Sequence, residues 1–150
     1  PKRFALGFGA MNSPVDSLAI PKIRRLVVIE LVLTLLVILG GAFVRASGSG
    51  AGCGEHWPLC NGQAIPIDPK IETIVEFTHR VTSGASLLVF VAIFFILRRQ
   101  FPLKHPSRAW ARVALVSFLL EAAIGAFLVL KKLVATDTSS LRALVIALHL

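Results

Sequence analysis

Side chains that could carry chemistry stand inside two otherwise apolar stretches of the sequence. Glu76 and His79 lie three residues apart in "ETIVEFTHRVTSG" and therefore share one face of a helix. His149 lies in a second apolar stretch, "LRALVIALHL". Ionisable residues in membrane-length apolar segments are costly to bury and usually mark function. Because imidazoles bind haem iron and carboxylates relay protons, these residues are the first candidates for a functional site.

The second candidate is the pair of cysteines, Cys53 and Cys60, in the glycine-rich segment "ASGSGAGCGEHWPLCNG". This short ring, with glycines and a proline to turn the chain, can close a disulfide in an oxidising compartment. Such a bridge would either staple the loop or take part in redox chemistry, and the residues leave both roles open. Two cysteines and His56 do not fill a tetrahedral structural zinc site, so we expect His56 to be solvated.

The elements that must position these residues are membrane-spanning helices. Hydrophobic residues make up 55% of the chain, with a mean hydropathy of +0.78, and they come in blocks long enough to cross a bilayer. The fold class is therefore all-α, a polytopic membrane helical bundle. We expect a polar N-terminal segment at 1–25 and a transmembrane bundle at 26–150. Its predicted parts are spans at 26–44, 74–97 and 110–130, a loop at 45–73 that carries both cysteines, and a truncated fourth helix from about Leu141.

Lysine and arginine predict the orientation of the spans. The N-terminal segment and the second connection are rich in basic residues, whereas the Cys-containing loop has few. We therefore expect the N-terminus on the inner side, cytoplasm or matrix, and the loop at 45–73 on the outer side. The formal charge of +8 comes from residues at span ends, which argues for topology and against nucleic-acid binding.

The two histidines are expected at a common depth. His79 lies about seven residues into its helix and His149 about nine, both counted from the outer side, which gives depths of roughly 10–14 Å. Matched imidazoles in a bundle are what bis-histidine haem ligation needs. The alternative is that each histidine is an interhelical hydrogen-bond partner. Arg80 could pair with a haem propionate or extend to lipid headgroups, and both options stay open.

Two further glutamates fall inside predicted spans. Glu30 lies near the inner end of the first span, and we expect its carboxylate to extend to the membrane interface. Glu121 lies in the middle of the third span and needs a partner or a proton. We favour an interhelical hydrogen bond for Glu121 over a catalytic role.

Taken together, three segments resemble the N-terminal half of haem A synthase, the CtaA/Cox15-like family. They are "GGAFVRASGSGAGCGEHWPLCNG", "VEFTHRVTSG" and "ALHL", and the resemblance covers about residues 25–150. It implies a protein of two fused four-helix bundles that oxidises the C8 methyl of haem O to the formyl group of haem A for terminal oxidases. The N-terminal bundle would bind this substrate haem, and the C-terminal bundle, absent from this chain, a haem b.

The resemblance also implies roles for single residues. His79 and His149 match the haem-iron ligands, with Arg80 beside the haem, and Glu76 matches a carboxylate implicated in catalysis. Cys53 and Cys60 match a cysteine pair implicated as a disulfide.

The implied surroundings are a bacterial plasma membrane or mitochondrial inner membrane, with lipid, haem O, haem O synthase and an electron donor as partners. A homo-oligomer is left open. The chain opens without methionine and stops at Leu150 inside an apolar run, so we expect a piece of a longer protein, inactive in isolation.

Three other functions are compatible with parts of this pattern. A bis-histidine electron-transfer cytochrome would use the same ligands without substrate chemistry. A quinone-coupled membrane disulfide oxidoreductase would also place cysteines in an outer loop, but typically in closely spaced pairs. An assembly factor without a cofactor would be colourless when purified.

Overall fold

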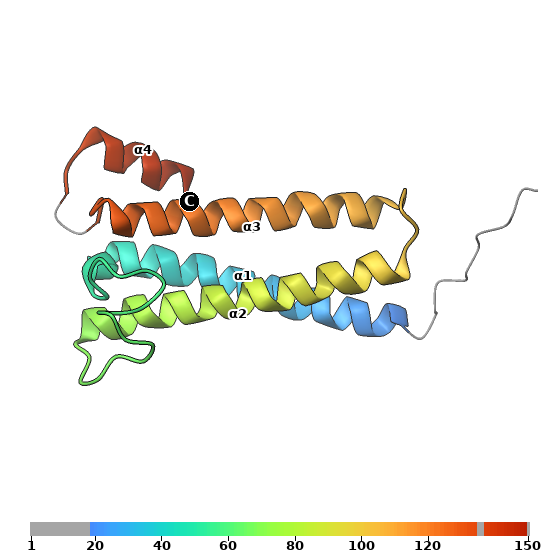
Figure 1. Ribbon diagram of the computed structural model, residues 1–150, viewed down its shortest axis with the longest axis horizontal. Coiled ribbons are helices and arrows are strands. Elements are labelled where there is room, and N and C mark those ends of the chain that lie inside the picture. Colours follow the sequence, from blue (N-terminus) through green and yellow to red (C-terminus); the bar gives the residue numbers. More distant parts are fainter. Residues whose placement is uncertain (1–18, 135–136, 150) are drawn as a thin grey trace, which may run out of the picture.

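The computed structural model describes residues 19–134 and 137–149, and this part of the chain is all-α, as predicted (Figure 1). Three long helices lie side by side, and a short fourth helix lies beside α3 at one end (Figure 1). The elements are α1 (Ala19–Ala46), the 3-10 helix η1 (Ser49–Ala51), α2 (Ile71–Gln100), α3 (Pro106–Leu130) and α4 (Ser140–Leu148).

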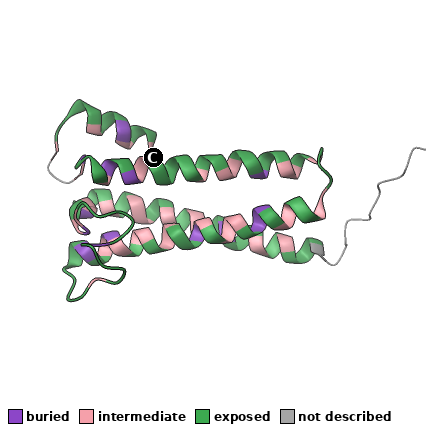
Figure 2. Cartoon of the chain, viewed as in Figure 1, coloured by how far each residue is buried: buried purple, intermediate pink, exposed green. Residues whose placement is uncertain are grey.

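Three of these helices are long and apolar enough to cross a membrane: Ile20–Ala46, Ile71–Gln100 and Pro106–Leu130. Their large apolar side chains are mostly exposed along the helices, which fits a surface that faces lipid (Figure 2). The protein is therefore an integral membrane protein. The first helix begins at Ala19, earlier than the predicted span, so Lys22, Arg24 and Arg25 belong to its first turns.

Packing between the helices relies on small and polar residues. Helix α1 packs against α2, α2 against α3, and α3 against α4. Ser86 of α2 is fully buried, and Ala111 and Ala126 of α3 are 5% and 8% exposed. In lipid, where apolar side chains gain little from meeting each other, small residues favour association because they let helix backbones approach closely.

Glu30 contradicts our expectation that its side chain extends to the interface. It is 5% exposed, and its Oε1 accepts hydrogen bonds from Ser86 Oγ at 2.7 Å and from Thr34 Oγ1 at 3.3 Å. Two hydroxyls, one across the α1–α2 contact, therefore satisfy one carboxyl oxygen inside the protein. The other oxygen, Oε2, is buried without a hydrogen-bond partner among the described residues.

We use the name Cys loop for residues 47–70, which join α1 to α2, and Cys-loop end for the end of the molecule where this loop lies. Helix α3 ends and α4 begins at the same end (Figure 1). The Ser139 side chain caps α4 by accepting a hydrogen bond from the Arg142 amide. Leu128, Leu133 and Val145 form a small core that holds α4 against α3.

Candidate functional site

His79 lies near the start of α2 and its ring faces two glycines of α1. A Cβ atom added at Gly40 would lie 3.4 Å from His79 Nδ1, and one at Gly41 would lie 3.1 Å from Cε1. The two glycines therefore make the room in which the imidazole lies. His79 Nδ1 is buried and has no hydrogen-bond partner among the described residues.

His149 directly follows α4 and its ring lies against α3. Its Nδ1 is 2.9 Å from Glu121 Oε2, which confirms the predicted interhelical hydrogen bond of Glu121. A Cβ atom added at Gly125 would lie 3.2 Å from His149 Cε1 and 3.3 Å from Nε2. Glu121 and Gly125 are one helical turn apart, so one face of α3 offers His149 both a hydrogen-bond partner and space.

The two histidine environments repeat each other. The sequence Gly-Ala-Phe occurs at residues 41–43 on α1 and again at 125–127 on α3. In the first copy the glycine lies against His79 of the next helix, α2, and in the second against His149, which directly follows the next helix, α4. Gly41 and Gly125 both lie close to the Cys-loop end of their helices. These glycines were not predicted from the sequence, although the repeated tripeptide indicates them.

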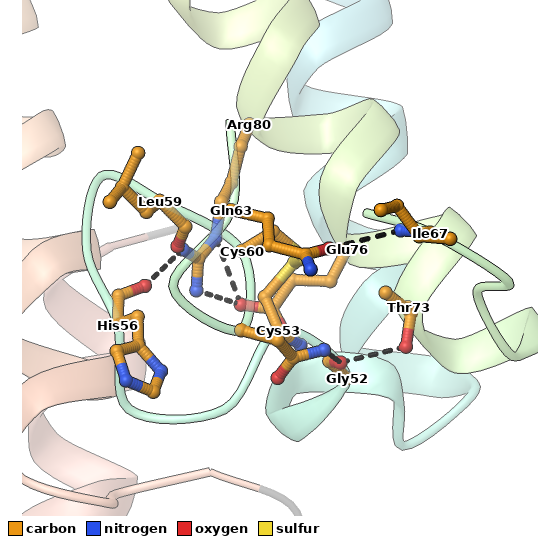
Figure 3. The surroundings of a disulfide bond; sticks show 11 residues. Gly52, Cys53, His56, Leu59, Cys60, Gln63, Ile67, Thr73, Glu76 and Arg80 are labelled. Carbon is orange, nitrogen blue, oxygen red and sulfur yellow. Dashed lines mark hydrogen bonds and ion pairs between the residues drawn. A yellow bond between two sulfur atoms is a disulfide. The ribbon is translucent and has the colours of Figure 1, made fainter. Parts of the chain in front are cut away.

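Glu76 binds the Cys loop to α2 (Figure 3). It is 3% exposed, and its Oε2 accepts a hydrogen bond from the Cys53 amide at 2.8 Å. Its Oε1 accepts a hydrogen bond from Arg80 Nε at 3.0 Å and a second, ion-paired contact from Arg80 Nη2. The carboxylate predicted to stand beside the haem ligand is thus engaged on both of its oxygens.

Arg80 completes this connection from the next turn of α2. Its Nη1 donates to the carbonyl oxygens of His56 at 2.6 Å and Leu59 at 2.7 Å (Figure 3). With the contacts to Glu76, four of its five N–H donors are used inside the protein. These loop carbonyls are partners that the sequence did not indicate. We call the contacts of Glu76 and Arg80 with the Cys loop the Glu76–Arg80 clasp.

The clasp surrounds a disulfide between Cys53 and Cys60, which are 0% and 1% exposed. The loop backbone also lies directly on the first turn of α2. Thr73 Oγ1 donates to the Gly52 carbonyl at 2.8 Å, and a Cβ added at Gly52 would lie 2.3 Å from the Glu72 carbonyl oxygen. The side chain of His56 is exposed, as predicted, although its carbonyl belongs to the clasp.

Sequence comparison gives the family. The COX15-CtaA model, described as cytochrome oxidase assembly protein, matches residues 24–150. The chain belongs to this family. No solved structure matches it significantly.

Curated relatives agree with this assignment. The chain is 41% identical to a heme A synthase of Shouchella clausii over 107 residues, which is 69% of this chain and 35% of that protein. It is 36% identical to a heme A synthase of Bacillus cereus over 104 residues, 69% of this chain and 33% of the relative. It is 51% identical to a protoheme IX farnesyltransferase of Thermus thermophilus over 116 residues, 77% of this chain but 19% of that protein. The chain therefore spans between about a fifth and a third of these relatives.

Proposed function

We propose that this family member is a haem A synthase and that the described region binds its substrate, haem O, between His79 and His149. The observation that carries the proposal is the repeated environment of the two imidazoles, each beside a glycine at the Cys-loop end. The two heme A synthases among the relatives support the same function.

The residues present fit a haem. Among the described residues, the buried Nδ1 of His79 has no hydrogen-bond partner that would mark the ring as a purely structural group. The Nδ1 of His149 is satisfied by Glu121, which leaves Nε2 beside Gly125 for a metal. When bound, the haem is the group whose C8 methyl is oxidised to the formyl group of haem A.

The protein's own part in this reaction is to bind and orient the haem and to supply a carboxylate. Glu76 lies one helical turn before His79, where it could relay a proton. Both of its oxygens are held by the Glu76–Arg80 clasp. These contacts use three of the about four lone-pair sites of the carboxylate, so proton transfer by Glu76 would use the remaining site on Oε2, the oxygen that also accepts from the Cys53 amide of the Cys loop. The remaining N–H donor of Arg80 is available for a haem propionate.

The proposal also covers the surroundings of the enzyme. We place the Cys loop outside and the N-terminus inside, in a bacterial plasma membrane or mitochondrial inner membrane, because basic residues concentrate on the opposite side from the loop. An electron donor and a haem b in the remainder of the protein would exchange electrons with this site. Haem O synthase is the proposed partner. In its support, a protoheme IX farnesyltransferase carries a region similar to this chain.

The test is the haem content of the full-length protein, expressed in a host that makes haem O but not haem A. The variants are His79→Ala and His149→Ala, and the matched controls are His56→Ala and His105→Ala, the other two histidines of the chain. We expect the first pair to lose haem A formation and the low-spin haem spectrum of this site. The controls should retain both.

Two outcomes would overturn the proposal. Haem A formation by both ligand variants at the wild-type level would remove the site. A protein that holds only haem b, in the wild type and in all variants, would instead favour an electron-transfer cytochrome. Farnesyl transfer to protohaem, the activity in the name of the Thermus thermophilus relative, is measured in the same extracts, and we expect none.

A further inference from the structure

The environments of the two histidines differ in one respect that the proposed function does not explain. His149 Nδ1 lies 2.9 Å from the Glu121 carboxylate, whereas His79 Nδ1 is buried without a described partner. Glu121 is half-exposed on a helix that is apolar enough to cross a membrane, a costly place for a carboxylate in lipid. Because a carboxylate at this position is costly, we expect Glu121 to have a role toward His149.

We infer that Glu121 is a positioning residue that holds His149 in the orientation and tautomer required of a haem ligand. This inference rests on the proposed function. A carboxylate accepts a hydrogen bond, so it places the imidazole proton on Nδ1 and leaves the lone pair on Nε2. The ring edge that carries Nε2 lies against Gly125, one turn along the same helix, where a Cβ would come within 3.3 Å of Nε2. Two residues of α3 thus set the position of the ring, and Nε2 has no hydrogen-bond partner among the described residues.

The chemical consequence is an unequal pair of ligands. A hydrogen bond from the second imidazole nitrogen to a carboxylate raises the basicity of the ligating nitrogen and orients the ring. Removal of such a partner typically weakens metal binding by about 10–100-fold. His149 is therefore the firmly held ligand. His79, whose Nδ1 has no hydrogen-bond partner among the described residues, lacks this support.

The experiment uses the full-length protein and haemin as the probe. Haem-depleted wild type, Glu121→Gln and Glu121→Leu are titrated with haemin, and the site is defined as the binding lost in His149→Ala. We expect Glu121→Leu to weaken binding by about 10–100-fold. Glu121→Gln, which keeps an acceptor oxygen without charge, should weaken it less. Glu30→Gln is the matched control, because it removes a membrane carboxylate that contacts Ser86 rather than a histidine, and it should bind as the wild type does.

A second measurement separates positioning from a general loss of structure. The midpoint potential of the bound haem should shift to more positive values in the order wild type, Glu121→Gln, Glu121→Leu, because a less basic ligand stabilises ferric iron less. If Glu121→Leu does not fold, the potential of Glu121→Gln decides the question. Wild-type affinity and potential in the folded Glu121 variants would overturn the inference alone. Wild-type haemin binding by His149→Ala would overturn the proposed function itself.

Discussion

The carboxylate of Glu76, on α2, accepts a hydrogen bond from the backbone amide of Cys53, 23 residues earlier in the chain, at 2.8 Å. This contact joins the disulfide loop to the helix that carries His79. The carboxylate is buried, and the guanidinium beside it is 13% exposed, so neither charge is well solvated. The contact therefore makes the proposed haem ligand and the cysteine pair parts of one structural unit.

Loss of the carboxylate should destabilise this unit. Glu76→Ala leaves the Arg80 guanidinium and the Cys53 amide without their acceptor, and breaking a buried pair costs about 3–5 kcal/mol. We expect a lower melting temperature and faster proteolysis within residues 47–70 of the purified protein. Glu55→Ala is the control, because Glu55 forms an exposed ion pair with Lys132 that contributes little. Equal stability of the two variants would show that the clasp contributes nothing.

The disulfide should be protected by the same contacts. Both sulfurs are buried, so a reductant reaches them only when the Cys loop leaves α2. We expect slow reduction by a phosphine in the native protein and faster reduction in Arg80→Leu, followed by labelling with a maleimide reagent that changes gel mobility. Reduction at one rate in both proteins would mean that the sulfurs are reached without loop movement. Labelling of the untreated wild type would show that the cysteines are free thiols.

Gly52 should tolerate no side chain. A Cβ there would lie 2.3 Å from the Glu72 carbonyl oxygen and 2.7 Å from the Thr73 amide, both backbone atoms that cannot turn aside. Gly52→Ala should therefore displace the Cys loop and accelerate disulfide reduction as strongly as Arg80→Leu does. Gly48→Ala serves as the comparison, because it adds a methyl group to open space in the same loop, although its positive φ makes a side chain strained there. Slow, wild-type reduction in Gly52→Ala would contradict the close packing of loop and helix.

The glycine of α1 that faces His79 should be needed for haem binding. Gly41→Leu would fill the space of the imidazole, and overpacking of this kind costs about 1–3 kcal/mol or displaces the ring. We expect a weakened or altered low-spin haem spectrum in the full-length protein. Gly84→Ala on α2 is the control, because nothing lies within 4 Å of its added Cβ. It should leave the spectrum unchanged and stabilise the helix by up to about 1 kcal/mol.

The sequence was sufficient to predict the helices, because apolar blocks are local features, and it singled out the two histidines as candidates, whose role as haem ligands stays a prediction. It also predicted that Glu121 needs a partner. It was not sufficient for the clasp, because the partners of Glu76 and Arg80 include a backbone amide and carbonyls of a distant loop. No pattern of residue types encodes backbone donors and acceptors. The expectation for Glu30 was wrong for a related reason, since its partner Ser86 lies 56 residues away.

The hydrogen bond between Glu30 and Ser86 allows a measurement of the free energy that one polar pair contributes to the packing of α1 against α2. Ser86→Ala removes the donor, Glu30→Leu removes the carboxyl group, and the double variant removes both. Interhelical hydrogen bonds in membranes contribute about 0.6 kcal/mol on average and at most about 1.7 kcal/mol. We expect a coupling energy within this range from a double-mutant cycle of unfolding in detergent. The single Ser86→Ala variant should lose more unfolding free energy than the double variant. It leaves a buried carboxyl oxygen of Glu30 with only Thr34 as its donor, whereas the double variant removes that carboxyl group. A coupling energy of zero would mean that the two helices are held by backbone proximity and small residues alone.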